Sequence, residues 1–353
     1  MPWELLSEKL LVNDVWTISD SPIDTEYLKL EFEDPDQTER VGVAAFSLNG
    51  ERALTQIVRA SLEPQVLEFK RFGILTQQKI GFRPWNPSAQ SLRIKVYWWN
   101  SLNAATSALF ARFTGTYLAA RNLAINQLIE TLTTKLIWQK FDCFYVFAAP
   151  NAADSLLNWK ANSFNCTPVN NPTFAIDRGY TGNTTTSYLN TNFIPTAGTN
   201  NFTRFNAGFG IYSRTNNASG TWADIGNSGT NISEIRARRV TGISYGVNSN
   251  NRPEAATAIP DSLGLISVSR LTEGSISAYR NGVLNDTQTS NNALALEPNS
   301  FLIGATRNTT VAPQWFSGRQ IAMAFIGAGL SAQEHSDLYA AVQLYLSTIG
   351  ASV

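Results

Sequence analysis

Apolar and polar residues alternate with a period of two through the first hundred residues. In residues 28–33 and 92–98 the apolar side chains fall on one face and the charged ones on the other, as in half-buried antiparallel strands. Residues 41–48 and 52–60 flank Asn49-Gly50, a pair that adopts the positive φ angles of a type I′ hairpin turn. With further strands near 65–71 and 78–83, about seven short strands predict a small β-sandwich in residues 1–100.

The pattern becomes helical between residues 117 and 139, and two interpretations fit it. In the first, residues spaced four and three apart form a heptad seam with one asparagine, a device that fixes register and oligomeric state. This oligomer seam comprises Leu118, Asn122, Ile125, Ile129, Leu132 and Leu136. In the second, Ile125, Leu128, Ile129, Leu132 and Leu136 form an ordinary amphipathic stripe packed on a neighbouring sheet. Residues 101–140 are predicted as a connector with this helix.

From residue 141 to about 327, short strands alternate with asparagine-rich loops. Strands are predicted near 143–149, 207–214, 234–240, 263–270, 275–280 and 319–326, with Asn281-Gly282 as a hairpin turn. A closing helix is marked by a capping box of Ser331 and Glu334. Its apolar face comprises Leu338, Val342, Tyr345, Leu346 and Ile349. His335, in the first turn, is expected to be structural or solvated.

Charge supports a division into domains. Residues 1–100 hold 25 charged residues, whereas the remaining 253 hold 29 and most of the 32 asparagines. The boundaries predicted are 1–100, 101–140 and 141–353. The net charge is zero, which argues against nucleic acid as the main partner, because phosphate binding needs an excess of Lys and Arg. The single histidine nearly excludes a Ser-His-Asp triad or a multi-histidine zinc site.

Targeting signals are not recognisable in the sequence. Glu4 and Glu8 interrupt the first apolar stretch, so no signal peptide is expected. No apolar run approaches the ~18 residues of a membrane span, so no membrane insertion is predicted. Cys143 and Cys166 are expected to be free thiols of a chain assembled in a reducing cytoplasm.

Candidate catalytic carboxylates are sparse. Glycoside hydrolysis needs two placed carboxyl groups, but the ExDxxE strand motif is missing. Residues 34–39 (DPDQTE) come nearest and are better explained as a turn. Asp224 and the asparagines around it could hold calcium, although no DxDxDG-type loop is present. We therefore expect no enzyme activity, no cofactor and no metal, while separated carboxylates that meet in space would leave hydrolysis open.

Recognition of a sugar is the chemistry that the loops between 180 and 260 favour. Aromatic rings stack on the C–H face of a sugar, and guanidinium and amide groups bind its hydroxyls. The candidate glycan-binding residues are Tyr212, Trp222, Arg236, Arg238, Tyr245 and Arg252. The alternative is that Trp222 and Tyr212 belong to the core and that Arg236 and Arg238 form a solvated strand face.

About two thirds of the chain, roughly residues 120–353, resembles a known family. The segments that carry the resemblance are LIETLTTKLIWQKFDCFYVFAAPNAADSLLNWK, PTFAIDRGYTGN, SYLNTNF, SISAYRNGVL, FLIGATRN and GRQIAMAFIGAGLSAQEHSDLYAAVQLYLSTIG. Together they are similar to the concanavalin A-like lectin/glucanase (laminin G-like) domain of bacteriophage tail fibre and tail-tip proteins. The resemblance implies a jelly-roll sandwich with a helix before and after it. It supplies no catalytic residues for this chain.

The resemblance also implies a function. We expect a phage tail fibre or receptor-binding protein, assembled in the host cytoplasm and located in the virion tail. Its N-terminal domain would attach to baseplate or tail proteins, and its C-terminal domain would bind host-surface polysaccharide. Phage fibres are usually trimers, which favours a homotrimer and the seam interpretation. The alternatives are a tail polysaccharide depolymerase and a structural baseplate component that binds no glycan.

Overall fold

The chain divides into two compact units, Met1–Leu102 and Asn103–Val353. The structure, a computed structural model, describes the backbone of eight strands in the first unit and residues 103–353 in the second. Residues 116, 118, 199, 219–220, 290–291 and 308–311 of the second unit are outside the described part, as are the side chains of 119 and 120.

The described strands of the first unit form two antiparallel four-stranded sheets. One sheet has the order β1 (Glu4–Leu11), β8 (Leu92–Trp99), β3 (Tyr27–Glu33), β6 (Gln65–Lys70), and the other β2 (Thr17–Ile18), β7 (Gly81–Pro84), β4 (Arg40–Phe46), β5 (Arg52–Arg59). β4 and β5 are the two arms predicted around Asn49-Gly50. The predicted β-rich class is confirmed. Residues 34–39, the nearest approach to an acidic motif, lie outside the described residues.

The second unit is a sandwich of two antiparallel sheets. The six-stranded sheet has the order β10 (Thr167–Val169), β13 (Tyr188–Asn190), β21 (Leu302–Ile303), β15 (Ile225–Ser228), β16 (Ile232–Arg236), β17 (Ser244–Ser249). The eight-stranded sheet has the order β11 (Thr173–Ala175), β12 (Gly179–Thr181), β24 (Gln320–Gly327), β14 (Ala207–Ser213), β18 (Gly264–Thr272), β19 (Ser275–Arg280), β20 (Val283–Gln288), with β9 (Phe141–Val146) also paired to β24. β22 (Thr306–Arg307) and β23 (Pro313–Gln314) form a separate ribbon.

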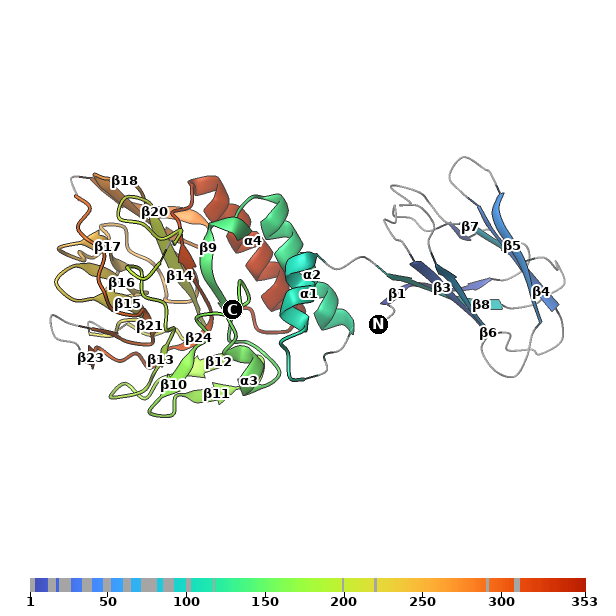
Figure 1. Cartoon of the computed structure of the whole chain (residues 1–353), viewed down its shortest axis with the longest axis horizontal. Coiled ribbons are helices and arrows are strands. Elements are labelled where there is room, and N and C mark those ends of the chain that lie inside the picture. Colours follow the sequence, from blue (N-terminus) through green and yellow to red (C-terminus); the bar gives the residue numbers. More distant parts are fainter. Residues whose placement is uncertain are drawn as a thin grey trace. The chain divides into compact units, whose positions relative to one another are not determined.

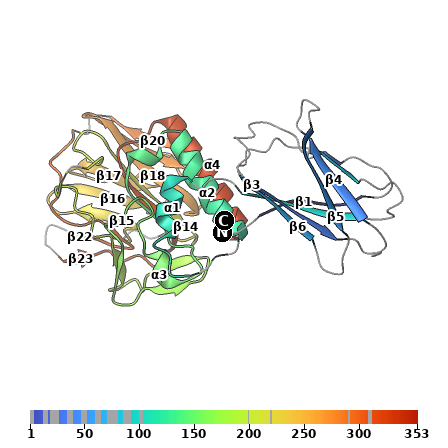
Figure 2. The ribbon, with the colours of Figure 1, turned by 45° about the vertical axis from the view of Figure 1, so that its right-hand side comes forward.

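Helices cover the outer face of the eight-stranded sheet, so this unit has three layers (Figure 1). They are α1 (Ala104–Phe110), α2 (Ala119–Thr134) and α4 (Ala332–Thr348), while the short α3 (Ala152–Ser155) and η1 (Trp138–Lys140) lie in connections. The jelly-roll type of sandwich with a terminal helix, predicted from the sequence, is confirmed. Figure 2 shows α2 and α4 running side by side.

The eight-stranded sheet is buried on both faces. On β14, Phe209 and Ile211 enter the core between the sheets, whereas Tyr212 enters the core beneath the helices. On β24, Ile326 faces the first core and Phe325 the second. Strands buried on both faces read as continuous apolar runs rather than alternating ones. This explains why the segment IAMAFIG carries no period of two.

The terminal helix begins as the sequence predicts. Ser331 Oγ accepts the amide of Glu334, and the Glu334 carboxylate accepts the amide of Ser331. Glu334 also pairs with Lys140 Nζ at 2.6 Å. His335, in the first turn, is fully buried between Ser267 and Ser269, each with Oγ 2.9 Å from a ring nitrogen. Its predicted structural role agrees with this environment.

The helix seam requires a correction. Ile125, Ile129 and Leu132 of α2 are fully buried inside the second unit, so they have no free face for a neighbouring chain. Leu136 lies beyond the end of α2 and is 63% exposed, and Leu118 is outside the described residues. Asn122 is partly exposed, whereas the buried asparagine is Asn126, whose Oδ1 accepts the amide of Asn103. These contacts correspond to the second interpretation, an amphipathic stripe.

One buried carboxylate fastens the segment between α1 and α2. Asp154 accepts hydrogen bonds from the Thr114 amide and hydroxyl, the Gly115 amide, Tyr117 Oη and Asn151 Nδ2, at 2.7–3.2 Å. Burial alone would raise the pKa of Asp154, but these hydrogen bonds outweigh it and the pKa is lowered. The segment predicted as a connector is therefore part of the second unit. Among the described residues, no helix has the length and apolar character needed to cross a membrane.

Candidate functional site

Two partly exposed tryptophans lie on adjacent segments of the second unit. Residues 222–224 and 315–317 run side by side, with a parallel bridge between Ala223 and Phe316 and the Ala223 amide donating to the Trp315 carbonyl at 2.7 Å. The rings of Trp222 and Trp315, here called the tryptophan platform, are both partly exposed. Each is backed by guanidinium groups.

Arg252 and Arg236 support Trp315. Their guanidinium carbons lie 4.3 and 4.9 Å from the ring centroid. Nε of each arginine also binds Oε1 of Glu234, at 2.8 and 2.7 Å respectively. Glu234 is fully buried and points away from the inter-sheet core, because its neighbour Ile235 points into it. One carboxylate thus fixes two guanidinium groups, and these fix the ring.

The backbone at Trp315 is strained. Its φ is +54°, a left-handed conformation that costs a residue with a side chain about 1–2 kcal/mol. The hydrogen bond to Ala223 and the bridge beside it hold this conformation in place. Strain that surrounding structure maintains is often found at functional sites. Nine other non-glycine residues of the described part also have a positive φ, and Trp315 differs from them in the two guanidinium groups against its ring.

Arg319 supports Trp222 in the same way. Its guanidinium carbon lies 5.4 Å from the ring centroid, and its Nη1 binds both carboxylate oxygens of Asp224 at 3.0 and 2.8 Å. Both charged side chains are fully buried. Nη2 donates to the carbonyls of Asn217 and Arg238, and Ser317 Oγ donates to Asp224. Buried charges need partners of opposite charge, and Asp224 pairs with Arg319 next to the ring, although Arg319 Nε has no hydrogen-bond partner among the described residues.

Small residues make room around Glu234. It pairs across the sheet with Gly226 on β15 and Gly246 on β17. A Cβ atom at Gly226 would lie 2.3 Å from Thr306 Oγ1, so a side chain there would displace the segment that covers the sheet. Burial raises the pKa of Glu234, while Arg236 and Arg252 oppose the rise. Glu234 is therefore closely packed by its neighbouring strands next to Arg236 and Arg252.

The structure brings three of the six predicted residues together directly. Trp222, Arg236 and Arg252 belong to the platform or its supports. The Arg238 carbonyl accepts a hydrogen bond from Arg319, whereas the Nε atom of Arg238 is buried without a partner among the described residues. Tyr212 and Tyr245 are fully buried and lie in different cores. Their hydroxyls bind Gln343 and Asp286. Neither tyrosine can stack on a sugar, so both assignments are corrected.

Sequence reasoning missed Trp315, Glu234, Asp224 and Arg319 as parts of this site. Asp224 was considered as a calcium ligand, but its oxygens accept hydrogen bonds from Arg319, Ser317 and the Ala237 amide. Residues 224, 234 and 319 come from three strands or their ends, and no local spacing connects them. The one available signal is that Trp315 is an aromatic residue in a loop that follows the Asn/Arg-rich region.

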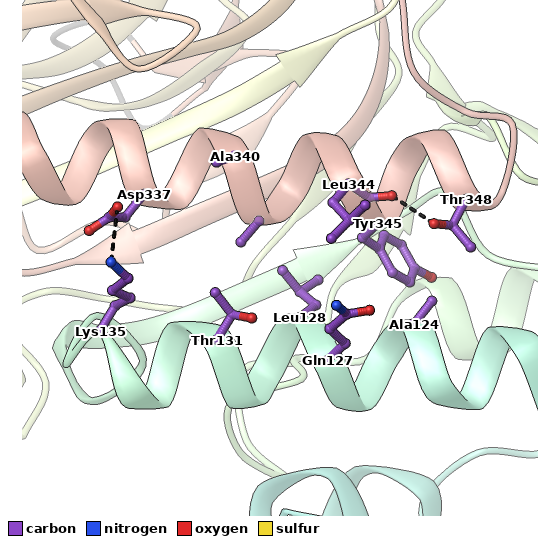
Figure 3. Close-up of a pocket in the computed structure, with 11 residues that line it drawn as sticks. Ala124, Gln127, Leu128, Thr131, Lys135, Asp337, Ala340, Leu344, Tyr345 and Thr348 are labelled. Atoms are coloured by element: carbon purple, nitrogen blue, oxygen red, sulfur yellow. Dashed lines mark hydrogen bonds and ion pairs between the residues drawn. The ribbon is translucent and has the colours of Figure 1, made fainter. Parts of the chain in front are cut away.

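Among the described residues, a groove also lies on the helix side of the second unit. It has a volume of about 200 Å³ and lies between α2 and α4, lined by Leu128, Leu344, Tyr345 and alanines (Figure 3). Lys135 and Asp337 form an ion pair across it at 3.5 Å. Its lining carries no cluster of guanidinium or carboxylate groups with which to orient a polar ligand.

Comparison with known proteins gives no family. No protein-family model matches the sequence, and no curated protein matches it. Among solved structures, domain 4 of a GH43 extracellular arabinanase from Geobacillus stearothermophilus, in complex with arabinotriose, has a TM-score of 0.37 and 17% identity, over 56% of this chain and 98% of that one. The binding domain of botulinum neurotoxin serotype D has a TM-score of 0.41 and 12% identity, over 57% of this chain and 52% of that one.

A mutant Trypanosoma rangeli sialidase displaying trans-sialidase activity is similar over 92% of this chain and 53% of its own length, with a TM-score of 0.38 and 8% identity. The matches thus span only about half of the neurotoxin domain and of the sialidase. All these TM-scores are below 0.5. We therefore base the fold on strand order and packing, and the site on its own geometry.

Proposed function

We propose that the second unit binds polysaccharide at the tryptophan platform without cleaving it. The observation that carries this proposal is Trp315, a partly exposed ring held in a strained backbone conformation over two fixed guanidinium groups. Stacking on an indole and hydrogen bonding to guanidinium and amide groups are the interactions that a sugar ring needs. Non-cleavage is supported by Asp224 and Glu234, which are fully buried and paired with arginines.

Binding is tested with the full chain and fluorescently labelled envelope polysaccharides of candidate host bacteria. Trp315→Ala and Trp222→Ala should each weaken binding about 3- to 10-fold, the value of one aromatic contact, and the double variant should bind more weakly still. The matched control is Phe205→Ala, because Phe205 is 45% exposed and stacks on Arg204 at 4.8 Å on another loop. Equal loss in all three variants, or no loss in the tryptophan variants, contradicts the proposal.

The biological setting of the proposal rests on the resemblance to phage tail proteins. In it, the chain is a tail fibre or receptor-binding protein of the virion, assembled in the host cytoplasm. The first unit attaches to tail or baseplate proteins, and the second recognises host-surface polysaccharide. A homotrimer rests on the same resemblance alone, since Ile125, Ile129 and Leu132 of the predicted seam are buried within the second unit. Light scattering checks it against the monomer mass of 38.8 kDa.

Two experiments separate this setting from its alternatives. Antibody against the chain should label the phage tail in electron micrographs and reduce adsorption. Tail labelling without any effect on adsorption would favour a structural baseplate component. Release of new reducing ends from host capsule or lipopolysaccharide would favour a depolymerase, and then Glu234→Gln and Asp224→Asn would show whether either carboxylate takes part.

A further inference from the structure

Positive charge is in excess in the segment that supplies Arg236 and Arg252, the two arginines against Trp315. The segment from 234 to 254, which includes β16 and β17, contains Arg236, Arg238, Arg239 and Arg252 against Glu234 and Glu254. The four guanidinium groups thus outnumber the two carboxylates, although the whole chain is neutral. A local excess of this kind persists only over about 8–10 Å at physiological salt, which is the range of a bound sugar residue.

Both carboxylates already accept hydrogen bonds within the protein. Glu234 is fully buried and its Oε1 is shared by Arg236 and Arg252. Glu254 Oε1 accepts the amides of Val240, Thr241 and Gly242 at 2.6–3.0 Å. Burial would raise the pKa of Glu254, but these amides lower it overall. Both acids therefore serve the fold, and the surface they leave is basic.

Arg252 is the guanidinium best placed to meet a ligand. It stacks on Trp315 and contacts Glu234 through Nε, and 22% of its side chain remains exposed. A guanidinium that is held at Nε and over a ring presents its Nη edge in a fixed orientation, the arrangement that binds a carboxylate with two parallel hydrogen bonds. Burial lowers the pKa of Arg252, Glu234 raises it, and the charges of Arg236 and Arg239 lower it further. An anion beside Arg252 would relieve that repulsion.

We propose that the ligand of the tryptophan platform is an acidic saccharide, in which a sugar carboxylate binds the Nη edge of Arg252 while the sugar ring contacts Trp315. This inference rests on the proposed function and narrows it to the class of polysaccharides that contain uronic or other carboxylated sugars.

The test compares polymers that differ only in the carboxyl group. Alginate, polygalacturonate and hyaluronan are each measured beside their carboxyl-reduced forms, together with neutral dextran, mannan, galactan and arabinan. We expect at least one acidic polymer to bind about tenfold or more tightly than its reduced form, the value of a charge-assisted pair, and the preference to shrink as salt is raised.

Variants assign the preference to Arg252. Arg252→Gln should remove the discrimination between acidic and reduced forms, and Arg252→Lys should retain part of it, because charge remains but the planar fork is lost. Lys135→Gln removes one positive charge from the helix side. It should leave both the affinity for the acidic polymer and the discrimination between acidic and reduced forms unchanged. Circular dichroism and the unfolding midpoint confirm that each variant folds. If Arg252→Gln does not fold, Arg252→Lys still tests the role of Arg252, and the comparison of acidic with reduced polymers in the native chain still tests whether the ligand is acidic.

The outcomes separate this inference from the proposed function. Equal binding to acidic and reduced forms, or binding to neutral polymers alone, overturns the acidic ligand and leaves glycan binding intact. Binding to none of the polymers overturns both. An acidic preference that survives unchanged in Arg252→Gln overturns the assignment of the carboxylate to this arginine.

Discussion

The two outer sides of the second unit are closed in opposite ways. The eight-stranded sheet is covered by α1, α2 and α4, which bury an almost purely apolar interface. The six-stranded sheet carries Glu234 and the arginines on its outer face, beside the Asp224–Arg319 pair at its end. Buried ion pairs are costly to desolvate and are often no more stabilising than apolar residues. The apolar side therefore supplies stability, and the charged side supplies fixed positions for exposed rings.

Asp224→Ala should have the largest effect on stability. It leaves Arg319 fully buried without its partner, which costs about 3–5 kcal/mol. The measurement is urea unfolding monitored by hydrogen exchange. Peptides from residues 103–353 report the second unit alone. Asp224→Ala combined with Arg319→Met removes both charges and should recover most of the loss. If the single variant is as stable as the native chain, the pair has no such role.

Ile129→Ala tests the apolar side of the comparison. Ile129 is fully buried between α2 and its neighbours, and removing a buried aliphatic side chain costs about 2–4 kcal/mol. Gln127→Ala, an exposed position on the same helix, should change stability by less than about 0.5 kcal/mol. Both variants should retain glycan binding when folded. A change in particle mass with little change in stability would instead favour a seam between chains.

Acidification should lower the free energy of unfolding of the second unit through His335, which is buried on the helix side. Burial lowers the pKa of His335 to about 3, below the ~6.5 of an unfolded histidine. As the pH falls, the unfolded chain therefore binds the proton before the folded one does. The stability that comes from keeping His335 neutral is fully present above pH ~6.5 and is lost as the pH falls toward 3. Between pH 6.5 and 5 the loss is about 2 kcal/mol. His335→Asn, which removes the only histidine, should flatten this difference; parallel pH profiles would contradict the assignment.

The smallest effect concerns the start of the terminal helix. Ser331→Ala removes the side-chain acceptor of the capping box, which costs about 1 kcal/mol. The change should appear as faster hydrogen exchange in the first turn of α4, with little change in β16 or β17. Ser331→Asp, which keeps an acceptor, is the matched control and should behave like the native chain. Equal exchange in both variants would show that Glu334 and Lys140 suffice.

Much of this architecture could be predicted from the sequence, for identifiable reasons. The hairpin at Asn281-Gly282 could be predicted because both residues have the positive φ that this pair favours. The short strands β15 and β17 could not, because IGNS and SYGVNS contain glycine, serine and asparagine, which rarely form strands. In β15, the absence of a side chain at Gly226 lets Thr306 pack closely against the strand.

The binding surface was only partly predictable. Trp222, Arg236 and Arg252 could be predicted because aromatic rings and guanidinium groups gathered in one polar region are the side chains that contact sugars. The burial of Tyr212 and Tyr245 could not be predicted, because it depends on the layers that pack against their strands, which the local sequence does not encode. Trp315 gains its role from Glu234, more than 80 residues away, and no local pattern encodes that contact.

Asp154 has a mechanical consequence. Tension applied to the chain near residue 103 acts first on the hydrogen bond between Asn103 and Asn126. Beyond α1 it acts on the five hydrogen bonds that connect the 114–117 segment and Asn151 to Asp154. These bonds connect α1 and α2 to α3, so a pulling force is shared among helices before it reaches β9. The load therefore enters the second unit through several hydrogen-bonded segments rather than through β9 alone.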